Sequence, residues 1–361
     1  MKVLFLTRSF YPNIGGVEKH ILELSKVLIS KGYKITVLSE INYGNNYHSK
    51  SPIGNPKGEI SGIKIYRINT GKNDWFKKFR IWKELFKNIN LFFSADIVHC
   101  HDVFFWYLPF RFIFPFKKIY TTFHGYEGNN IPTKKAIFMH KIAEVLSNGN
   151  ICVGDYLKKW YGTKPTIVIY GAINIPENLS FQQSVNEIKN VLYIGRLEEE
   201  AGILTYLKTL KILKDLGINF KLTVLGDGKQ KKQAQKYSSD NNLNVTFKGF
   251  VKEVYDYLPK TDIVFTSRYL GTLESFVFKK FVFCVYNNEI KKDCFKMSPF
   301  GKFIILEENP NMLAKEVLKY IKNPNLYNTK ITKAYSWVKL QTWENLASQY
   351  IKLWKQKGLM S

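Results

Sequence analysis

"FLTRSFYPNIGGVEKHILELSKVL", residues 5–28, is the stretch that decides the fold. It begins as an apolar strand-like run, passes through a loop containing Gly15 and Gly16, and continues as an amphipathic helical pattern. The apolar positions of that pattern, spaced by three and four residues, are Val17, Ile21, Leu24 and Leu28. Strand, glycine turn and helix together form the repeating unit of doubly wound α/β sheets.

The same alternation continues along the chain. In the first half the β-rich runs are KVLFLTR, KITVLSE, GIKIYRI, DIVHCHD, KIYTTFHG, NICVG and TIVIYGA. After a polar stretch at 174–190, the runs are VLYIGR, KLTVLGDG, NVTFKG, DIVFTSR, FVFCVYNN and KFIILEE. This order predicts two α/β units with parallel sheets, whose ligands lie at the carboxyl ends of the strands. Two such units facing one another would form a deep cleft.

Length and composition agree with this organisation. The chain has 361 residues, of which 45% are apolar, enough for two domains with full cores. No pair of the four cysteines has CxxC spacing, which indicates buried thiols in a reducing compartment. The apolar run of MKVLFLTRSF is shorter than a signal peptide requires, and no stretch approaches the roughly 20 apolar residues of a membrane span. We therefore expect a cytoplasmic protein that contacts a membrane, if at all, from that side.

The formal charge of +25 is spread evenly. Residues 1–180 contribute 25 − 12 = +13 and the remainder 29 − 17 = +12, so there is no basic tail. Such a field attracts polyanions, anionic lipid and phosphorylated small molecules. An AT-rich genome that favours lysine codons is an equally good explanation of the charge.

Polar residues directly after the strands are the candidate site residues. Paired glycines at a helix start let backbone N–H groups approach an anion, as Gly15 and Gly16 would. Asp102, His124 and Glu274 follow strands in the same way. Taken singly, each is more typical of a turn or of a satisfied polar residue than of a catalytic site.

The motifs are more specific as an ordered series: FYPNIGGVEKH, DIVHCHD, TFHG, VIYGAIN, YIGRLEEEAG, VLGDG, VTFKGFV and FTSRYLGTLES. This series resembles glycosyltransferase family 4, which has the GT-B fold, from residue 1 to about residue 350. The late stretch SWVKLQTWENLASQY is similar to the C-terminal helix that crosses back onto the N-terminal domain in that fold.

The resemblance implies two Rossmann-like domains facing across a cleft. We expect an N-terminal, acceptor-side domain at 1–173, a linker at 174–189, a nucleotide-sugar-binding domain at 190–340 and the crossing helix at 341–361. It also implies sugar transfer from a nucleotide-sugar donor, with retention of configuration and without a cofactor or bound metal. The absence of a DxD motif or a His/Asp ligand cluster agrees with that.

The resemblance assigns roles at matching positions. His124 would lie beside the transferred sugar, Arg196 would hold the donor diphosphate, and Glu274 would bind the ribose hydroxyls. The remaining donor-side residues are Gly15, Gly16, Gly226, Gly271, Thr272 and Leu273, and the acceptor-side residues are His20 and Asp102. The chemistry fits, because a guanidinium offers bidentate donors to a diphosphate and a carboxylate accepts two hydrogen bonds from a diol. A helix starting near residues 271–273 would add N–H donors.

The chain departs from the family pattern mainly in its second half. In GRLEEEAGI (195–203), Ala201 stands where the family usually has a lysine. Thr266 stands where the family often has a second glutamate, in a loop that is shorter here than in the family. The usual GKP reads Lys279, Lys280 and Phe281, and the PNG before the linker reads YGA. The glutamates of 198–200 precede a predicted helix near Ile203, where acidic groups favour the helix dipole.

The segment 72–93, KNDWFKKFRIWKELFKNINLFF, bears on the acceptor. A helical wheel places an aromatic and apolar stripe on one side, made of Trp75, Phe79, Trp82, Phe86 and Ile89. The basic residues toward the other side are Lys77, Arg80, Lys83 and Lys87. The stripe is either the face that packs on the sheet or one side of an interfacial helix on an anionic membrane.

The sequence therefore predicts a glycosyltransferase acting on a glycan, glycolipid or lipid-linked acceptor, in the cytoplasm or peripherally on the inner face of the cytoplasmic membrane. One alternative is a partner subunit that is a catalytically impaired homologue. The other is a basic nucleic-acid-binding protein, although no nucleic-acid partner is expected, since the charge is even and no such motif is present.

Overall fold

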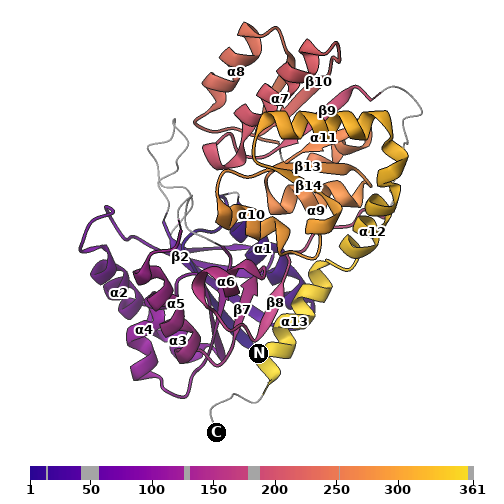
Figure 1. The fold of residues 1–361 in the computed structure, drawn as a ribbon. Helices are drawn as coiled ribbons and strands as arrows, with labels where there is room; N and C mark the ends of the chain where they lie inside the picture. The colour runs from indigo at the N-terminus through magenta and orange to yellow at the C-terminus, as the bar shows by residue number, and fades with distance from the viewer. Residues whose placement is uncertain (14, 42–56, 126–130, 178–187, 252, 357–361) are drawn as a thin grey trace. The chain divides into compact units, whose positions relative to one another are not determined.

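The computed structural model describes residues 1–13, 15–41, 57–125, 131–177, 188–251 and 253–356. Their contacts divide the chain into two units (Figure 1). The first contains Met1–Glu127, Ile131–Gly171 and Trp343–Ser361, and the second contains Ala172–Thr342. Most of the predicted linker at 174–189 lies outside the described residues.

The described part of the first unit contains an eight-stranded sheet in the order β3-β4-β2-β1-β5-β6-β7-β8. The strands are β1 (Lys2–Thr7), β2 (Lys34–Glu40), β3 (Lys57–Ile60), β4 (Ile63–Ile68), β5 (Ile97–His101), β6 (Lys118–Phe123), β7 (Asn150–Val153) and β8 (Ile167–Ile169). All pairs are parallel except β3 with β4. The sequence missed β3, a short and largely exposed edge strand without an apolar run.

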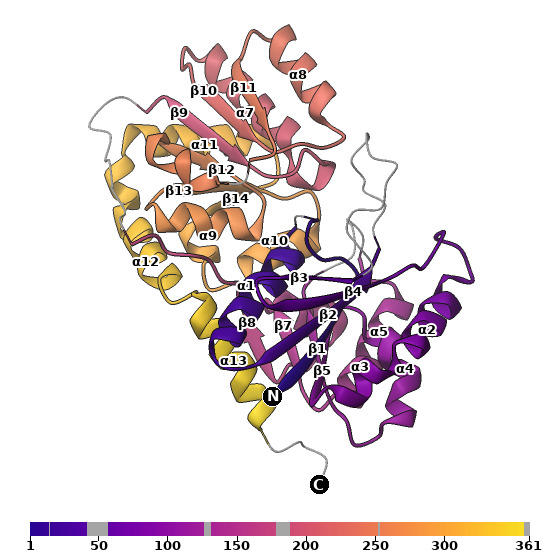
Figure 2. The same cartoon turned by 180° about the vertical axis from the view of Figure 1, so that it is seen from behind.

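Helices cover both faces of this sheet, as the right-handed connection of parallel strands requires (Figure 2). They are α1 (Gly16–Ser30), α2 (Lys77–Lys87), α3 (Ile89–Ser94), α4 (Phe104–Ile113), α5 (Lys134–Leu146) and α6 (Tyr156–Tyr161). The predicted amphipathic helix is α1, which buries Ile21, Leu24 and Leu28.

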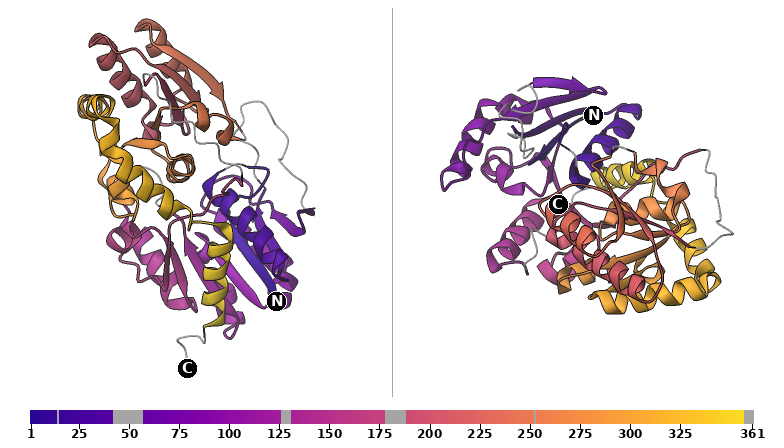
Figure 3. Two further views of the ribbon diagram at one scale, coloured as in Figure 1. Left: turned by 90° about the vertical axis from the view of Figure 1, so that its right-hand side faces the viewer. Right: turned by 90° about the horizontal axis from the view of Figure 1, so that it is seen from above.

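The last helix, α13 (Trp343–Lys355), also belongs to the first unit, although it follows the whole second unit in sequence. It packs beside α1 (Figure 3). Its buried face contains Trp343, Leu346, Ala347, Tyr350, Leu353 and Trp354. The aromatic members of that face reach the ends of β5 and β6, where polar side chains gather.

The buried face of helix α2 is narrower than the aromatic stripe that the helical wheel gives. Ile81 and Leu85 are the residues that it buries. Trp75 precedes the helix and is 85% exposed, and Phe79 is 58% exposed. The interpretation that the stripe packs on the sheet is therefore wrong for these two residues and for Phe86, which is 43% exposed, and the aliphatic Ile81 and Leu85 form the buried face instead.

The described part of the second unit contains a parallel six-stranded sheet in the order β11-β10-β9-β12-β13-β14. The strands are β9 (Asn190–Ile194), β10 (Lys221–Leu225), β11 (Asn244–Gly249), β12 (Ile263–Phe265), β13 (Phe281–Val285) and β14 (Ile305–Glu307). The helices are α7 (Ile203–Asp215), α8 (Lys231–Asp240), α9 (Tyr269–Val277), α10 (Glu289–Lys296), α11 (Pro310–Lys322) and α12 (Asn328–Val338).

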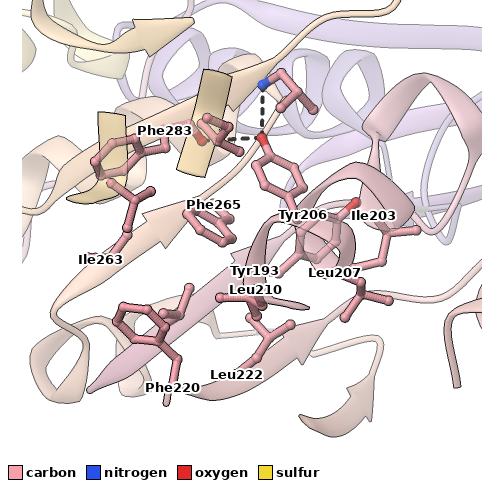
Figure 4. Packing of buried hydrophobic residues seen from close by; sticks show 14 of the residues in the cluster. Tyr193, Ile203, Tyr206, Leu207, Leu210, Phe220, Leu222, Ile263, Phe265 and Phe283 are labelled. Carbon is pink, nitrogen blue, oxygen red and sulfur yellow. Dashed lines mark hydrogen bonds between the residues drawn. The ribbon is translucent and has the colours of Figure 1, made fainter. Parts of the chain in front are cut away.

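Two apolar cores lie on the two faces of this sheet. Figure 4 shows part of one, in which Tyr206 of α7 packs against Phe265 of β12 with ring centroids 4.8 Å apart. The Tyr206 hydroxyl donates to the Phe283 carbonyl at 3.2 Å and accepts from the Val285 N–H at 3.0 Å (Figure 4). These contacts fix the end of β13 relative to α7 and thereby the loops that carry the candidate site.

Candidate functional site

Four histidines meet at one edge of the first unit's sheet. His99 and His101 lie in β5, His124 directly follows β6, and His20 lies in α1. His101 Nδ1 and His124 Nε2 are hydrogen-bonded at 2.8 Å. The rings of His20 and His124 meet edge to face, with centroids 4.7 Å apart. The structure thus brings together two of the predicted site residues, His20 and His124.

Burial keeps these imidazoles neutral. Burial lowers the pKa of His20 to about 3, and burial followed by the charge of His20 lowers the pKa of His99 to about 3. The pKa values of His101 and His124 also lie well below the ordinary value, chiefly because of burial. At neutral pH each ring therefore has one N–H donor and one acceptor nitrogen.

Asp102 holds the loop that carries His124. It follows β5 in a left-handed conformation, with φ of 59°, and its Oδ1 accepts the His124 backbone N–H at 2.9 Å. A short polar side chain tolerates this backbone region better than most residues do. The predicted acceptor-side Asp102 thus lies beside His124 and orients it.

Gly15 caps the N-terminus of α1 in an extended conformation, and Gly16 is the first helical residue. A Cβ added at Gly16 would meet no atom within 4 Å among the described residues. Packing of this part of the chain therefore does not require a glycine at 16. The open space beside the free N–H groups of a helix start suits an anionic ligand.

In the second unit, two arginines follow two neighbouring strands. Arg196, after β9, is exposed and forms no ion pair with a described residue. Arg268 follows β12, and its Nη2 donates to Glu200 Oε1 at 3.2 Å. A Cβ built on Gly195 would lie 3.5 Å from Arg268 Cγ, so Arg268 lies against the loop that carries Arg196.

The backbone before Arg268 is fixed by hydrogen bonds. Ser267 Oγ donates to the Val285 carbonyl at 2.8 Å and lies 2.8 Å from the Tyr206 hydroxyl. Thr266 Oγ1 donates to the Ile194 carbonyl at 2.7 Å and accepts the Arg268 N–H at 3.2 Å. Thr266 therefore joins the ends of β12 and β9.

A third cation follows the next strand, β13. Lys291 of α10 is 3% exposed and forms no ion pair with a described residue. Burial, followed by repulsion from Arg268, lowers the pKa of Lys291 to about 8. Arg196, Arg268 and Lys291 thus follow the adjacent strands β9, β12 and β13. An anion at the carboxyl ends of these strands would relieve the repulsion between Arg268 and Lys291.

Helix α9 begins at Tyr269, two residues before the predicted start near 271–273. Thr272 donates both its N–H and its hydroxyl to the Arg268 carbonyl at 3.0 Å, so its N–H is not a free donor. Leu273 is buried in the core. Glu274 is 5% exposed and lies near the Tyr255 phenol, whose pKa it helps to raise after burial.

Packing accounts for two of the predicted donor-side glycines. A Cβ on Gly226 would lie 1.8 Å from the Gly195 carbonyl oxygen, and one on Gly271 would lie 2.7 Å from Thr266 Oγ1. These glycines allow the loops of adjacent strands to approach one another closely.

Two of the three glutamates of GRLEEEAGI form specific contacts, in addition to any effect on the helix dipole. Besides the bond from Arg268 to Glu200, Glu198 Oε1 accepts the Lys229 N–H at 3.3 Å. Ala201 is 1% exposed. The helix that follows begins at Ile203, as predicted.

The sequence could not identify Arg268 or Lys291 as site residues. Arg268 lies inside FTSRYLGTLES, but the resemblance assigns it no role, and no motif marks Lys291. The significance of both residues depends on which strands are neighbours. Among the residues that the structure describes, no group of three His, Cys, Asp or Glu side chains could hold a metal ion. Three cysteines are buried, Cys294 is partly buried, and none forms a disulfide.

Comparisons with known proteins identify the family. The family model described as Glycosyltransferase Family 4 matches residues 14–175, and the one described as Glycosyl transferases group 1 matches residues 175–337. An uncharacterized glycosyltransferase of Methanocaldococcus jannaschii is 24% identical over 94% of this chain and 95% of its own length.

One further similarity concerns the fold of the whole chain, and another concerns a short segment of its sequence. Sucrose-phosphate synthase from Thermosynechococcus elongatus has a TM-score of 0.75 at 15% identity, with 98% of each chain covered. One subunit of the human phosphatidylinositol N-acetylglucosaminyltransferase is 53% identical over 59 residues, which are 16% of this chain and 10% of the human protein.

Proposed function

Because the chain belongs to glycosyltransferase family 4 and has the GT-B fold, we propose that it transfers a sugar from a nucleotide-sugar donor to a glycan, glycolipid or lipid-linked acceptor, with retention of configuration. The observation that carries this proposal is the set of three cations, Arg196, Arg268 and Lys291, after three neighbouring strands of the second unit. A diphosphate leaving group gains negative charge as the glycosidic bond breaks.

In this proposal the second unit binds the donor nucleotide. Arg196 is the main cation on the diphosphate, because it has no carboxylate partner among the described residues. Arg268 contributes to the same anion but shares its charge with Glu200. Glu274 binds the ribose hydroxyls, since a carboxylate suits a vicinal diol.

The first unit provides the sugar and acceptor side. His124 lies beside the transferred sugar, Asp102 orients its loop, and His20 contacts the acceptor. The N–H groups at Gly15 and Gly16 contribute to the binding of the donor phosphates. We expect no metal requirement, because side-chain cations neutralise the diphosphate, so that transfer should proceed undiminished in a chelator.

The acceptor proposal rests on the surface of α2, α3 and α4. Eight large apolar side chains on or next to these helices are exposed, and we call this set the aromatic face: Trp75, Phe76, Phe79, Phe86, Phe93, Phe112, Ile113 and Phe116. Exposed lysines lie on or beside the same segments, namely Lys72, Lys78, Lys83 and Lys87 on or before α2, and Lys118 at the start of β6. Aromatic rings flanked by basic residues suit the headgroup region of an anionic bilayer.

We therefore propose peripheral binding of the aromatic face to the cytoplasmic membrane and a lipid-linked acceptor. The short identity with the human phosphatidylinositol N-acetylglucosaminyltransferase supports a lipid acceptor. Within the described residues, no helix is long and apolar enough to cross a bilayer.

A catalytically impaired partner subunit is the second candidate, favoured by the replacement of the family's lysine by Ala201. Binding of a panel of nucleoside diphosphates and nucleotide sugars, followed by donor turnover with a membrane extract, separates the two candidates. An enzyme binds one donor and consumes it. Tight nucleotide binding with no turnover in any extract would favour the impaired homologue. If no nucleotide binds, the proposed donor site is refuted for the enzyme and for the impaired homologue alike.

A further inference from the structure

A continuous chain of hydrogen bonds connects α13 to His20. Trp354 Nε1 lies 3.1 Å from His99 Nδ1, and His99 Nε2 lies 2.7 Å from Thr122 Oγ1. Thr122 Oγ1 lies 2.8 Å from the Tyr350 hydroxyl, which lies 2.9 Å from His20 Nε2. All five side chains are at most 5% exposed.

The direction of the first two bonds follows from chemistry. An indole N–H can only donate, so His99 Nδ1 must be the acceptor. Since His99 is neutral, its single proton then lies on Nε2, and this N–H donates to Thr122 Oγ1.

The direction of the last two bonds follows from Thr122. Its hydroxyl accepts from His99 and still has one hydrogen to donate. Within the described residues the Tyr350 oxygen is the remaining partner of this hydroxyl, and leaving a buried donor unpaired is costly. Thr122 therefore donates to Tyr350, and the Tyr350 O–H donates to His20 Nε2.

We infer that Trp354 and Tyr350 are positioning residues, which hold His20 in the tautomer that is protonated at Nδ1. His20 Nε2 then accepts from Tyr350, and Nδ1–H, which no described residue engages, is a hydrogen-bond donor for a ligand oxygen. This inference rests on the proposed acceptor-side role of His20. In that role His20 donates to an acceptor or sugar oxygen, and it does not remove a proton through Nδ1.

The tautomer is measurable without any substrate. The chain has six histidines, so long-range proton–nitrogen NMR on histidine-labelled full-length protein, with His20→Gln for assignment, resolves each ring. We expect His20 to show a protonated Nδ1 and a bare Nε2, and His99 to show the opposite. A wild-type His20 protonated at Nε2 would overturn the inference, whether or not nucleotides bind to the second unit.

Variants test the connection to α13. Tyr350→Phe removes the donor to His20 Nε2, and we expect the ratio of Nδ1–H to Nε2–H tautomers to fall roughly fivefold, the value of one neutral hydrogen bond. Thr122→Val should lower the same ratio, since Tyr350 is then free to reorient. Tyr107→Phe is the matched control, because the buried Tyr107 hydroxyl has no hydrogen-bond partner among the described residues. An unchanged His20 tautomer in folded Tyr350→Phe would refute the role of α13.

Discussion

The substitution Arg268→Gln tests whether the second unit binds a diphosphate as proposed. It removes the charge of the guanidinium but keeps the Cγ atom that lies against Gly195. Arg268 was not anticipated from sequence, so the result depends on the geometry at the ends of β9, β12 and β13 alone.

The expected magnitude follows from the surroundings of Arg268. A hydrogen bond to a charged group contributes about 1.5–3 kcal/mol. Arg268 is 34% exposed and already pairs with Glu200 at 3.2 Å, so solvent and the carboxylate both reduce its contribution. We therefore expect a loss of about 1.5–2 kcal/mol, or roughly 10- to 30-fold in Kd. Arg196→Ala, which removes a cation without such a partner, should cost about 1.5–3 kcal/mol, or roughly 10- to 150-fold.

The assay is calorimetric titration with a nucleoside diphosphate and with its parent nucleoside. The ratio of the two affinities isolates the contribution of the phosphates, and Arg268→Gln should reduce that ratio while leaving nucleoside binding unchanged. Lys292→Gln is the control, because Lys292 lies beside Lys291 but pairs with Glu289 at the surface. Glu200→Gln should raise the ratio, since it removes the carboxylate that competes for Arg268.

The double variant Arg196→Ala, Arg268→Gln should lose less than the sum of the two effects if both side chains bind the same phosphate group. Ala201 is 1% exposed, so in Ala201→Lys the longer side chain must leave this buried position. If its ammonium then reaches the same anion, this substitution in either single variant should restore part of the ratio. An unchanged ratio in Arg268→Gln would refute the reasoning and leave Arg196 as the only arginine on the diphosphate.

Four further outcomes are expected. Glu274→Gln should weaken nucleotide binding by about 1.5–3 kcal/mol with unchanged thermal stability, and equal affinity would remove Glu274 from the ribose site. His124→Ala should bind nucleotide normally but transfer sugar much more slowly; wild-type turnover would make His124 structural. Nucleoside-diphosphate affinity should fall as the pH rises past about 8, because Lys291 then loses the charge that favours the anion, and Lys291→Met should abolish this dependence. In co-sedimentation with anionic vesicles, neutralising Lys72, Lys78, Lys83 and Lys87 should weaken the free energy of vesicle binding by about 4 kcal/mol, at ~1 kcal/mol for each lysine. Neutralising an exposed control set in the second unit should have little effect on vesicle binding; the set is Lys221, Lys232, Lys236 and Lys248.

The vesicle experiment uses a different set of lysines from the one that the helical wheel suggests. Lys77 Nζ pairs at 2.7 Å with the buried Glu40, and Arg80 pairs at 2.8 Å with Asp74. Substituting Lys77 or Arg80 would therefore disturb the fold as well as the surface charge. Equal losses from the two lysine sets would leave only the general basic field as the cause of membrane binding.

The sequence predicted the alternation of strands and helices because most of the strands carry an apolar run that is buried. Thirteen such runs correspond to strands, and only the exposed strand β3 was missed among the described residues. The residues that follow the strands were predictable as site candidates for the same reason. The partners of these residues could not be predicted. A pair such as Arg268 and Glu200 is separated by 68 residues in sequence and forms only because of the order of the strands in the sheet.

Two lysines, Lys279 and Lys280, stand where the family usually has GKP, but they do not replace the lysine that is missing at 201. In the structure, Lys279 Nζ lies over the Tyr335 ring, 4.9 Å from its centroid, and Lys280 Nζ donates to the Pro259 carbonyl. Both lysines serve local packing, whereas the cation beside the loop comes from Arg268.

The position of α13 also has a consequence for how the protein is made. Ribosomal synthesis proceeds from the N-terminus, at about 5–20 residues per second. About 170 residues of the second unit, Ala172–Thr342, must be synthesised before α13 exists, which takes roughly 10–35 s. During that interval the nascent first unit lacks the helix that covers α1 and the buried histidines. The second unit can complete its fold before the first, so the order of folding should be the reverse of the order of translation.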